Sequence, residues 1–574
     1  MGAGIPATLA ILLICAALSF LPGFGLLTHV RCLRPAERLA CSGPLSAALC
    51  GSAALALFLL ARGGILLSPW LAVVAPLLLG SGALALAILR GLDPRPDADA
   101  RQVGHFWLLL LGELALLELL LPTFGGADWF ADWWVHFHRS LVYGNLVGLH
   151  DLARTCVEPR LRCVAPVYDN GVLTARTPLY NLLGGIAVGI AGGRLAAYQL
   201  AAAAWGAVLA GPVVLLAQRR GRRMARTAGL LLLLNPFLVH LALYPWPKVL
   251  TGAFEVLAIY WLCRLRDGVP WAAGAMIAAL LLAVFTHTAA VLYLAALGGY
   301  LVLRPPPALR WQPLLAGTLV VGALILPWVV WGTREYGWRG VFLSSPTTSV
   351  SQPSGAAWLG RKADGLVFSL LPMPLVHALE RRPFDGTIQT WTTVNFALEF
   401  PFNAYTGGLG AACSLLVVLG RRRLRLSSDA RLLAVLVAGS AALGSVALDP
   451  TYLTGGAATN SMAGTIALGL VALAWVDWAP GWRRAALTAV GLEAALVAAL
   501  YSGYLSVGTW YQDPNTRVLG GMGQRMLSAE LGTGGVAAVV VLVALALATG
   551  LALLVWISHV PAPSRAARPE VPAA

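Results

Sequence analysis

The sequence predicts an all-α polytopic membrane protein, and three observations support that fold class. The chain has 574 residues, of which 58% are hydrophobic and only 11% are charged, a balance that suits lipid better than water. Apolar segments long enough to cross the hydrocarbon core, which takes about 20 helical residues, recur along the whole chain. Two connecting loops are far longer than a plain helical bundle needs. We therefore expect about fifteen transmembrane helices, with the two large loops facing outward as a cap.

The predicted spans are distributed over the whole chain. The first one lacks a basic amino-terminal region and a small-residue cleavage site, which indicates a retained helix rather than a signal peptide. The Pro- and Ala-rich segment 559–574 after the last span predicts a disordered cytoplasmic tail. The spans are 5–27, 44–62, 68–90, 105–124, 195–217, 226–243, 248–263, 270–285, 287–303, 313–332, 405–420, 430–448, 462–479, 485–503 and 533–557.

Basic residues in the short loops predict the orientation, because such loops stay in the cytoplasm whereas long loops cross largely regardless of charge. If the spans alternate, all the arginine clusters of the short loops fall on one side, and the long loops 125–194, 333–404 and 504–532 face outward. This topology explains the net charge of +15 without a nucleic-acid partner. The clusters are Arg31/Arg34/Arg38, Arg90/Arg95/Arg101, 218–226, Arg264/Arg266, Arg304/Arg310, 421–426 and Arg483/Arg484.

The segment 177–193 is apolar but short, and it would reverse this alternation if it crossed the membrane. We expect it to be a helix at the outer membrane interface or one that is only partly inserted, with a true span as the alternative. Cys156 and Cys163 lie in the first outward loop, where they could form a disulfide or remain free thiols.

Aromatic and charged residues mix in both large outward loops, as in WFADWWVHFHR of the first and REYGWRGVF of the second. This composition suits a flat polar ligand such as a sugar and an anionic ligand such as a phosphate. Residues 132–147 have the spacing of an amphipathic helix lying on the interface. The plainer interpretation of this stretch is an aromatic belt in which Asp132 is only a helix N-cap.

Four short motifs follow one another in the chain: DWWVHF at 132–137, RTPLYNLL at 176–183, LLAQRRGRRMART at 215–227 and LILPWVVW at 324–331. In this order they resemble the GT-C superfamily of membrane glycosyltransferases, in particular the branch of the protein mannosyltransferases and the lipid A aminoarabinose transferase. The resemblance covers about residues 105–335. The chain departs from that branch at YPWPKVLTGAF (244–254), where Lys248 stands in place of an expected acid.

The resemblance divides the chain into five parts. Residues 1–104 are additional amino-terminal helices, and 105–335 form a GT-C-like catalytic core that includes the outward loop 125–194. Residues 336–404 are the second large outward loop, 405–558 the carboxy-terminal helices and 559–574 the tail.

The resemblance also implies a function. It indicates transfer of a sugar from a polyprenyl-phosphate donor to a lipid or cell-envelope glycan acceptor, at the outer, periplasmic face of a bacterial inner membrane. The reaction would invert the anomeric carbon and use an aspartate as general base. Asp132 matches the family's aspartate best, with Asp128 second. Whether a divalent metal ion takes part is open; Asp128, Asp132 and His136 would be its ligands.

Further site residues are expected from position and residue type. Cations and a histidine near the outer face would hold the donor phosphate, although a snorkelling lysine, a helix-turn histidine and a solvated arginine face are the plainer alternatives. Aromatic and polar residues of the loops would contact the acceptor or the sugar. The phosphate candidates are Lys248, His287, Arg334, Arg339 and Arg176, and the acceptor or sugar candidates are His136, Trp133, Tyr180, Tyr452 and Asn460.

Acidic residues inside predicted spans support a second function class, a transporter or flippase of lipid-linked saccharides. Acids at membrane depth are costly and are functional candidates by default. They are Glu113, Glu118, Glu255 and Glu493. Transporters commonly contain internal repeats, and the absence of a convincing repeat in this sequence favours the transferase.

Overall fold

A computed structural model describes residues 5–120, 131–149, 172–243, 246–344, 359–360, 363, 427–447 and 463–475. Within these ranges every regular element is an α-helix or a short 3-10 helix, as the sequence predicts. Five of the helices are long and apolar enough to cross a membrane: Ala10–Leu27, Pro35–Arg62, Leu71–Leu89, Ala197–Gln218 and Trp311–Phe342. The predicted total of about fifteen spans includes segments 405–420, 485–503 and 533–557, which lie outside the described residues.

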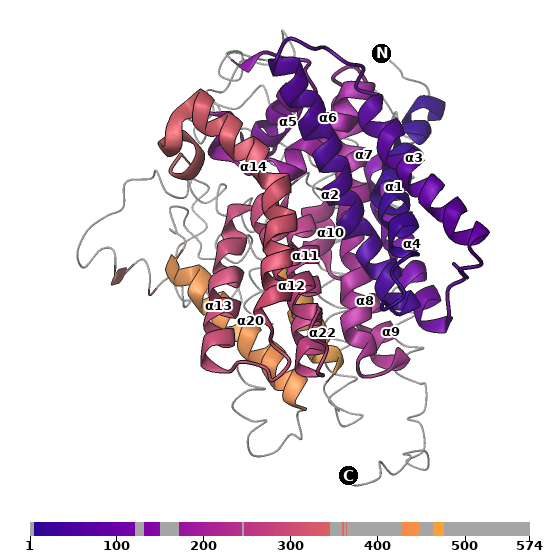
Figure 1. Ribbon diagram of the computed structural model, residues 1–574, viewed down its shortest axis with the longest axis vertical. Coiled ribbons are helices and arrows are strands. Elements are labelled where there is room, and N and C mark those ends of the chain that lie inside the picture. The colour runs from indigo at the N-terminus through magenta and orange to yellow at the C-terminus, as the bar shows by residue number, and fades with distance from the viewer. Residues whose placement is uncertain are drawn as a thin grey trace, which may run out of the picture.

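The amino-terminal helices form one side of the bundle (Figure 1). They are α1 (Ile5–Leu27), α2 (Pro35–Arg62), α3 (Leu71–Leu89) and α4 (Ala98–Leu120). Small residues let their backbones approach closely, as is common between membrane helices: a Cβ added to Gly25 of α1 would lie 2.0 Å from the carbonyl oxygen of Gly80 in α3. The outer surface of α3 carries exposed apolar side chains such as Leu78 and Leu89, which suits contact with lipid.

The chain next forms the centre of the bundle. After α5 (Ala131–Tyr143), η3 (Leu173–Ala175) and α6 (Leu179–Ile190), the chain enters α7 (Leu195–Gly206), η4 (Ala207–Leu209) and α8 (Ala210–Gln218). The window Ala197–Gln218 is apolar throughout and completely enclosed by other helices, so it forms the core of the bundle. The next elements are α9 (Arg222–Leu233), α10 (Pro236–Leu243) and α11 (Lys248–Arg266).

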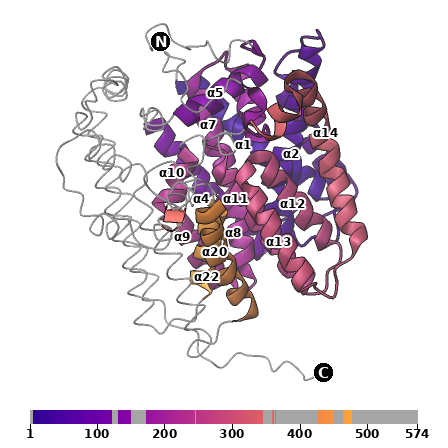
Figure 2. The same cartoon turned by 90° about the vertical axis from the view of Figure 1, so that its left-hand side faces the viewer.

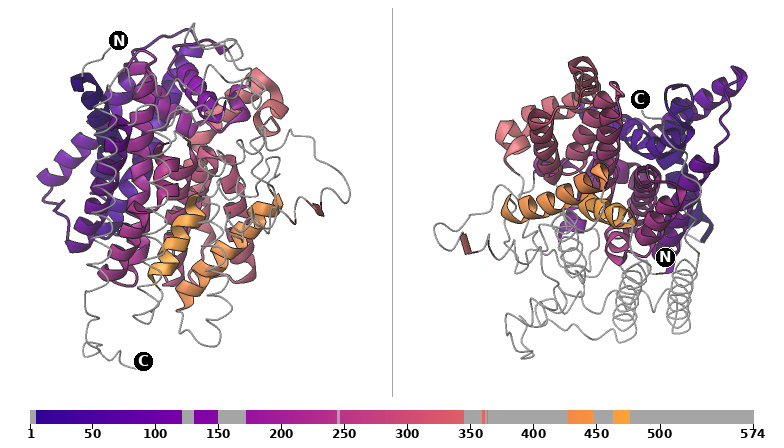
Figure 3. Two further views of the ribbon diagram at one scale, coloured as in Figure 1. Left: turned by 180° about the vertical axis from the view of Figure 1, so that it is seen from behind. Right: turned by 90° about the horizontal axis from the view of Figure 1, so that it is seen from below.

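The remaining helices cover the other side of α11. Helices α12 (Ala272–Thr286), α13 (Val291–Leu303, preceded by η5, Thr288–Ala290) and α14 (Trp311–Phe342) stand together there (Figure 2). Helix α22 (Ala463–Ala474) packs against α9, α11 and α20 (Ser428–Ala447), and α20 also contacts α13 (Figure 3). The described helices thus bring residues from far along the chain back onto α11.

Several predicted boundaries differ from the observed ones, and special residues account for three of them. Helix α2 begins at Pro35 rather than at 44, because proline suits the first turn, where its missing N–H is not needed. The predicted span 226–243 is two helices that break at Leu234 and Asn235, before Pro236. Helix α14 continues to Phe342, ten residues beyond the predicted end at 332, and bends at Gly337, whose φ of 72° favours glycine.

The apolar segment 177–193 contains one short helix, α6. Its 12 residues rise about 18 Å, which is too short to cross a hydrocarbon core of about 30 Å. This length agrees with the expectation that the segment is not a full span, and its place at the outer membrane interface stays a prediction. The helix is enclosed by α2, α5 and α7, with nearly all of its residues buried.

Helix α2 defines two ends of the molecule. Its 28 residues extend about 42 Å. Near its start, Glu37 contacts Tyr260 and Arg264 in the last turns of α11, and we name this the network end. Near its carboxy-terminal end, the ring of Phe58 packs on the rings of Tyr143 in α5 and Trp331 in α14, with 4.9 Å between the ring centroids in each pair. We name that the cap end; α5, α6 and the bent part of α14 gather there (Figure 1).

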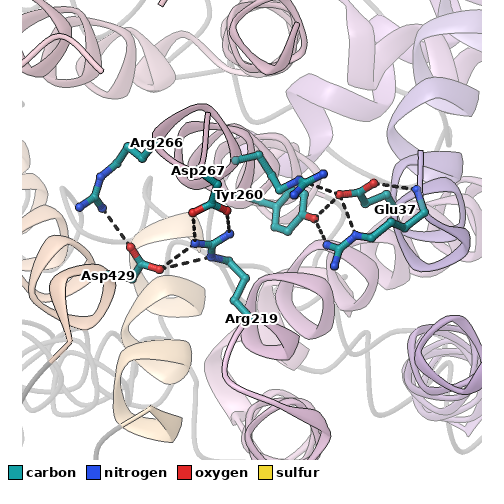
Figure 4. A network of polar contacts seen from close by, with 8 residues as sticks. Glu37, Arg219, Tyr260, Arg266, Asp267 and Asp429 are labelled. Carbon is teal, nitrogen blue, oxygen red and sulfur yellow. Dashed lines mark hydrogen bonds and ion pairs between the residues drawn. The ribbon is translucent and has the colours of Figure 1, made fainter. Parts of the chain in front are cut away.

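Ion pairs join helices at the network end (Figure 4). Arg219, just after α8, lies 2.6 Å from Asp267 and 2.9 Å from Asp429 of α20. Arg266 pairs with the same Asp429 at 3.0 Å. The Arg219 guanidinium holds the pKa of the Asp267 carboxyl below its ordinary value. Arginines from the clusters at 31–38, 218–226 and 264–266 therefore lie at one end, as the alternating topology predicts.

Candidate active site at the cap end

Helix α5 presents a buried polar face. His136, Arg139 and Tyr143 follow one another at spacings of three and four residues, which places them on one side of a helix. The exposed fractions of their side chains are 2%, 0% and 3%. Position 132 stands one turn before His136 in the same helix, while the side chains of Asp132 and Trp133 and the whole of Asp128 lie outside the described part of the chain.

A hydrogen bond between a histidine of α5 and an asparagine amide of α6 joins the polar face of α5 to α6. His136 Nδ1 lies 2.8 Å from Oδ1 of Asn181, and Asn181 Nδ2 donates to the carbonyl oxygen of Thr177 at 3.3 Å. Because the amide nitrogen faces Thr177, its oxygen accepts from His136, so Nδ1 carries the ring proton and Nε2 is the basic nitrogen of the neutral ring. The ring of Tyr180 stands edge-on to His136 at 6.2 Å between centroids. The sequence candidates His136 and Tyr180 thus lie together.

Arg139 ties α5 to the segment before α6. Its Nη2 donates to the carbonyl oxygen of Val172 at 2.9 Å, and its Nε donates to that of Leu173 at 3.2 Å. These two carbonyls open the short helix η3, so the guanidinium fixes η3 against α5.

The bent end of α14 packs on the same assembly. Trp328 Nε1 donates to the Tyr143 hydroxyl at 2.9 Å. Beyond the bend, the Thr174 hydroxyl of η3 donates to the carbonyl oxygen of Gly340 at 2.6 Å. A Cβ added to Gly332 would lie 2.8 Å from Thr174 Cγ2, so the close approach depends on glycine. Three of the four sequence motifs, in α5, α6 and α14, therefore meet at the cap end.

Several arginines surround this assembly. Arg176 directly follows η3 and is partly buried, while Arg334 and Arg339 are exposed on α14. Thr174 stands two residues before Arg176, and Gly340 directly follows Arg339. The hydrogen bond between Thr174 and Gly340 therefore brings the two chain segments that carry these arginines together. Arg62, at the end of α2, lies over the Phe58 ring at 5.1 Å. A guanidinium offers a fork of donors that suits a phosphate, so Arg176, Arg334 and Arg339 stay candidates for that role.

Lys248 and His287, the other two phosphate candidates, each stand beside the start of a helix, and each has a described contact with a residue two positions away. Lys248 begins α11, is 7% exposed, and its Nζ lies 3.6 Å from the ring centroid of Trp246. His287 separates α12 from η5, and its Nδ1 accepts from the amide of Ala289 at 3.2 Å. These contacts are local, so the phosphate role of both residues stays a prediction.

The acids inside spans have different surroundings. Glu255 of α11 is buried beside Gly464 at the start of α22. Its Oε2 has no hydrogen-bond partner among the described residues. Oε2 of Glu113 in α4 is buried and has no hydrogen-bond partner among the described residues. The Glu118 side chain and all of Glu493 lie outside the described ranges.

Several remaining predictions concern residues that the structure does not describe: Tyr452, Asn460, Cys156 and Cys163. Within the described ranges, no group of three or more His, Cys, Asp or Glu side chains is placed to hold a metal ion. Asp128 and the Asp132 side chain fall outside that search, so the question of a metal at these residues stays open.

The cap-end residues that were not predicted from the sequence include Asn181, Arg139 and Arg62. Arg139 could have been found, since it stands seven residues after Asp132 and three after His136 and so shares their helix face by spacing. Asn181 lies inside the quoted motif RTPLYNLL, but its pairing with a residue 45 positions away cannot be seen in one sequence. Arg62 ends a predicted span, where a lone cation is ordinarily a headgroup anchor.

Comparison with known proteins gives structural matches only. No protein-family model matches the chain, and no curated protein matches its sequence. Two crystal structures of ArnT from Cupriavidus metallidurans are similar, one bound to undecaprenyl phosphate and one in the apo state. Both are 15% identical to this chain, and the match covers 79% of this chain in each case. It covers 75% of the ArnT chain in the bound structure and 74% in the apo structure, with a TM-score of 0.46 for both. At that identity no residue's role is transferred from ArnT, and the chain is an all-helical membrane protein that is similar to it in structure.

Proposed function

We propose that this protein is a membrane glycosyltransferase that moves a sugar from a polyprenyl-phosphate donor to a lipid or cell-envelope glycan acceptor. One observation carries the proposal: three motifs that are far apart in the sequence meet at the cap end. The bond between His136 and Asn181 joins the first motif to the second. The bond between Trp328 and Tyr143 joins the last motif to the helix of the first. The donor class is the one that the order of these motifs implies.

The proposed reaction is an inverting displacement. The acceptor hydroxyl oxygen attacks the anomeric carbon as the bond from that carbon to the phosphate oxygen breaks. Asp132 takes the hydroxyl proton as general base, with Asp128 as the second candidate. The bonding electrons leave with the phosphate, and the polyprenyl phosphate is the second product.

The leaving phosphate gains negative charge, which cations placed in advance would stabilise. Arg176, Arg334 and Arg339 at the cap end are the proposed ligands, together with Lys248 and His287. The acceptor and the sugar would contact His136, Trp133 and Tyr180, and also Tyr452 and Asn460 of a later loop. A divalent ion held by Asp128, Asp132 and His136 is an alternative source of positive charge, and loss of activity on treatment with EDTA would identify it.

The proposed location is a bacterial inner membrane, with the cap end facing outward. The gathering of arginine clusters at the network end supports this orientation, because cytoplasmic loops retain basic residues.

The test uses the purified full-length protein in lipid nanodiscs and a panel of polyprenyl-phosphate sugars. We expect transfer by the wild type and a loss of about a thousandfold in kcat for Asp132→Asn, the range for removal of a general base. Asp93→Asn is the matched control, because the exposed Asp93 only accepts from the backbone N–H of Arg95 and asparagine can do the same. Undiminished transfer by Asp132→Asn would remove this residue as the base.

The buried Oε2 of Glu113 keeps a transporter or flippase of lipid-linked saccharides as the second candidate. The same reconstituted protein separates the two functions. A transporter would carry the labelled lipid-linked saccharide across a vesicle membrane with no new glycosidic bond, whereas the proposed enzyme forms that bond.

A further inference from the structure

Arg139 is the largest side chain among the fully buried ones of the described residues. Burying a guanidinium is costly unless its N–H groups and charge are satisfied. Arg139 lies in the helix that carries the proposed base, so the groups that it contacts bear on the proposed site. Its described hydrogen bonds go to two consecutive backbone carbonyls, those of Val172 and Leu173.

The contacts of Arg139 continue beyond η3. Thr174, the next residue after Leu173, donates from its hydroxyl to the carbonyl oxygen of Gly340 at 2.6 Å. Gly340 follows Arg339 in the bent end of α14, and Arg176 lies two residues after Thr174. A single series of hydrogen bonds therefore runs from α5 through η3 to the bend of α14, and it passes between two of the arginines proposed to hold the phosphate.

The geometry of these bonds requires an arginine. Nε and Nη2 belong to one edge of a rigid planar fork, which matches two carbonyls of consecutive residues. A lysine would keep the positive charge, but its single ammonium on a flexible stem cannot hold both carbonyls in the same fixed arrangement. The shape of the group, as well as its charge, sets the position of η3 relative to α5.

We propose that Arg139 is a positioning residue, which sets the distance between the base on α5 and the phosphate-binding arginines on η3 and α14. This inference rests on the proposed function. Arg139 acts through Val172, Leu173 and Thr174, and it takes no proton in the reaction. An error of about 1 Å between reacting groups can reduce a rate about a hundredfold, so a change in this support is expected to be visible in kcat.

The kinetic test compares Arg139→Lys with Arg95→Lys, a conservative change of an exposed arginine, in the full-length protein. We expect kcat to fall about a hundredfold in Arg139→Lys, with a smaller change in the KM of the donor and an unchanged pH profile, and no change in Arg95→Lys. Thr174→Val, which cuts only the link to α14, is expected to give a smaller loss in kcat.

A double-variant cycle separates positioning from general damage. If Arg139 acts through the arginines, the losses of Arg139→Lys and Arg339→Ala will not multiply in the double variant, because both disturb one unit. Multiplying losses, or equal kcat values for wild type and Arg139→Lys, would overturn the inference.

A distance measurement makes the inference testable without any activity. Spin labels would be attached through p-acetylphenylalanine in place of Leu146 and Trp338, which are exposed, 42% and 63%, after α5 and in the bend of α14. We expect Arg139→Lys to shift or broaden the distance distribution between the labels, and Arg95→Lys to leave it unchanged. An unchanged distribution in Arg139→Lys overturns the positioning role. Absence of transfer by the wild type would overturn the proposed function instead.

Discussion

At the scale of single residues, the amide of Asn181 is the contact that decides the state of His136. Its Oδ1 accepts a hydrogen bond from Nδ1–H of His136, with 2.8 Å between the two heavy atoms, and both side chains are buried. We expect Asn181→Leu to lower the free energy of unfolding by about 1 to 3 kcal/mol, because the imidazole N–H loses its acceptor in a site that water does not reach. Thermal unfolding in detergent measures this loss.

The control for Asn181→Leu is Asn181→Asp, which keeps an acceptor oxygen at the same place. Asn181→Asp is expected to retain the bond to His136 and to favour the charged imidazolium. Equal unfolding temperatures for Asn181→Leu and the wild type would show that the hydrogen bond contributes nothing to stability.

Residues of the candidate site could be predicted from the sequence where they lie within a short recognisable motif. His136 and Tyr180 were identified within short motifs, and both lie at the cap end. Their partners were not identified, because a hydrogen bond between residues 45 positions apart leaves no trace in one sequence. The carbonyls of Val172 and Leu173 carry no side-chain signal at all, so the anchoring by Arg139 could be found only in three dimensions.

At the scale of elements, the crossing of α11 and α22 depends on two glycines. A Cβ added to Gly252 would lie 2.7 Å from the backbone nitrogen of Gly464. We expect Gly252→Ala to lower the free energy of unfolding by about 1 to 3 kcal/mol, because one helix must move away from the other. The matched control is Gly298→Ala in α13, where an added Cβ would meet no described atom within 4 Å. Gly298→Ala is expected to be neutral or stabilising, and equal effects of both variants would contradict a role for close helix contact.

The ion pair between Arg219 and Asp267 joins α8 to the end of α11 and makes their packing pH-dependent. The pKa of Asp267 lies below its ordinary value of 3.8, so the folded state binds fewer protons than the unfolded state. The contribution to stability is therefore present above pH 3.8 and is lost as the pH falls through the lower native pKa.

The corresponding variant is Asp267→Asn. We expect it to lower the free energy of unfolding at pH 7 by about 0.5 kcal/mol, a small effect because the carboxylate side chain is 41% exposed to solvent. The difference from wild type should vanish in acid. Equilibrium unfolding as a function of pH tests this, and a difference that grows on acidification would contradict a lowered pKa of Asp267 in the folded state.

Most described helices were predictable because apolar length is a strong local signal. The boundaries were less predictable where special residues act. The second predicted span begins at 44, although Pro35 already opens α2. The tenth ends at 332, although α14 continues through Arg334 and Arg339 and bends only at Gly337. For α14, the contact of Gly340 with Thr174 extends the helix beyond its apolar stretch.

At the scale of the whole molecule, α2 runs from one polar end of the bundle to the other. Acids pair with arginines at the network end, where Asp267, Asp429 and Glu37 each contact at least one guanidinium. At the cap end, guanidinium groups contact backbone carbonyls and aromatic rings, as Arg139 and Arg62 do. The ion pairs described at the network end join α2, α8, α11 and α20.

This division predicts how the protein sits in its membrane. The clusters of arginine at the network end should face the cytoplasm, since basic residues are retained there. Two exposed positions report the two ends: Cys32 at the network end and Trp338 on the bent part of α14. In intact spheroplasts, we expect a membrane-impermeant maleimide to label Trp338→Cys, while Cys32 is labelled only after permeabilisation. Mass spectrometry of the labelled peptides separates these sites from Cys156 and Cys163 of the predicted first outward loop. Labelling of Cys32 in intact spheroplasts, with protection of position 338, would invert the topology and place the candidate active site in the cytoplasm.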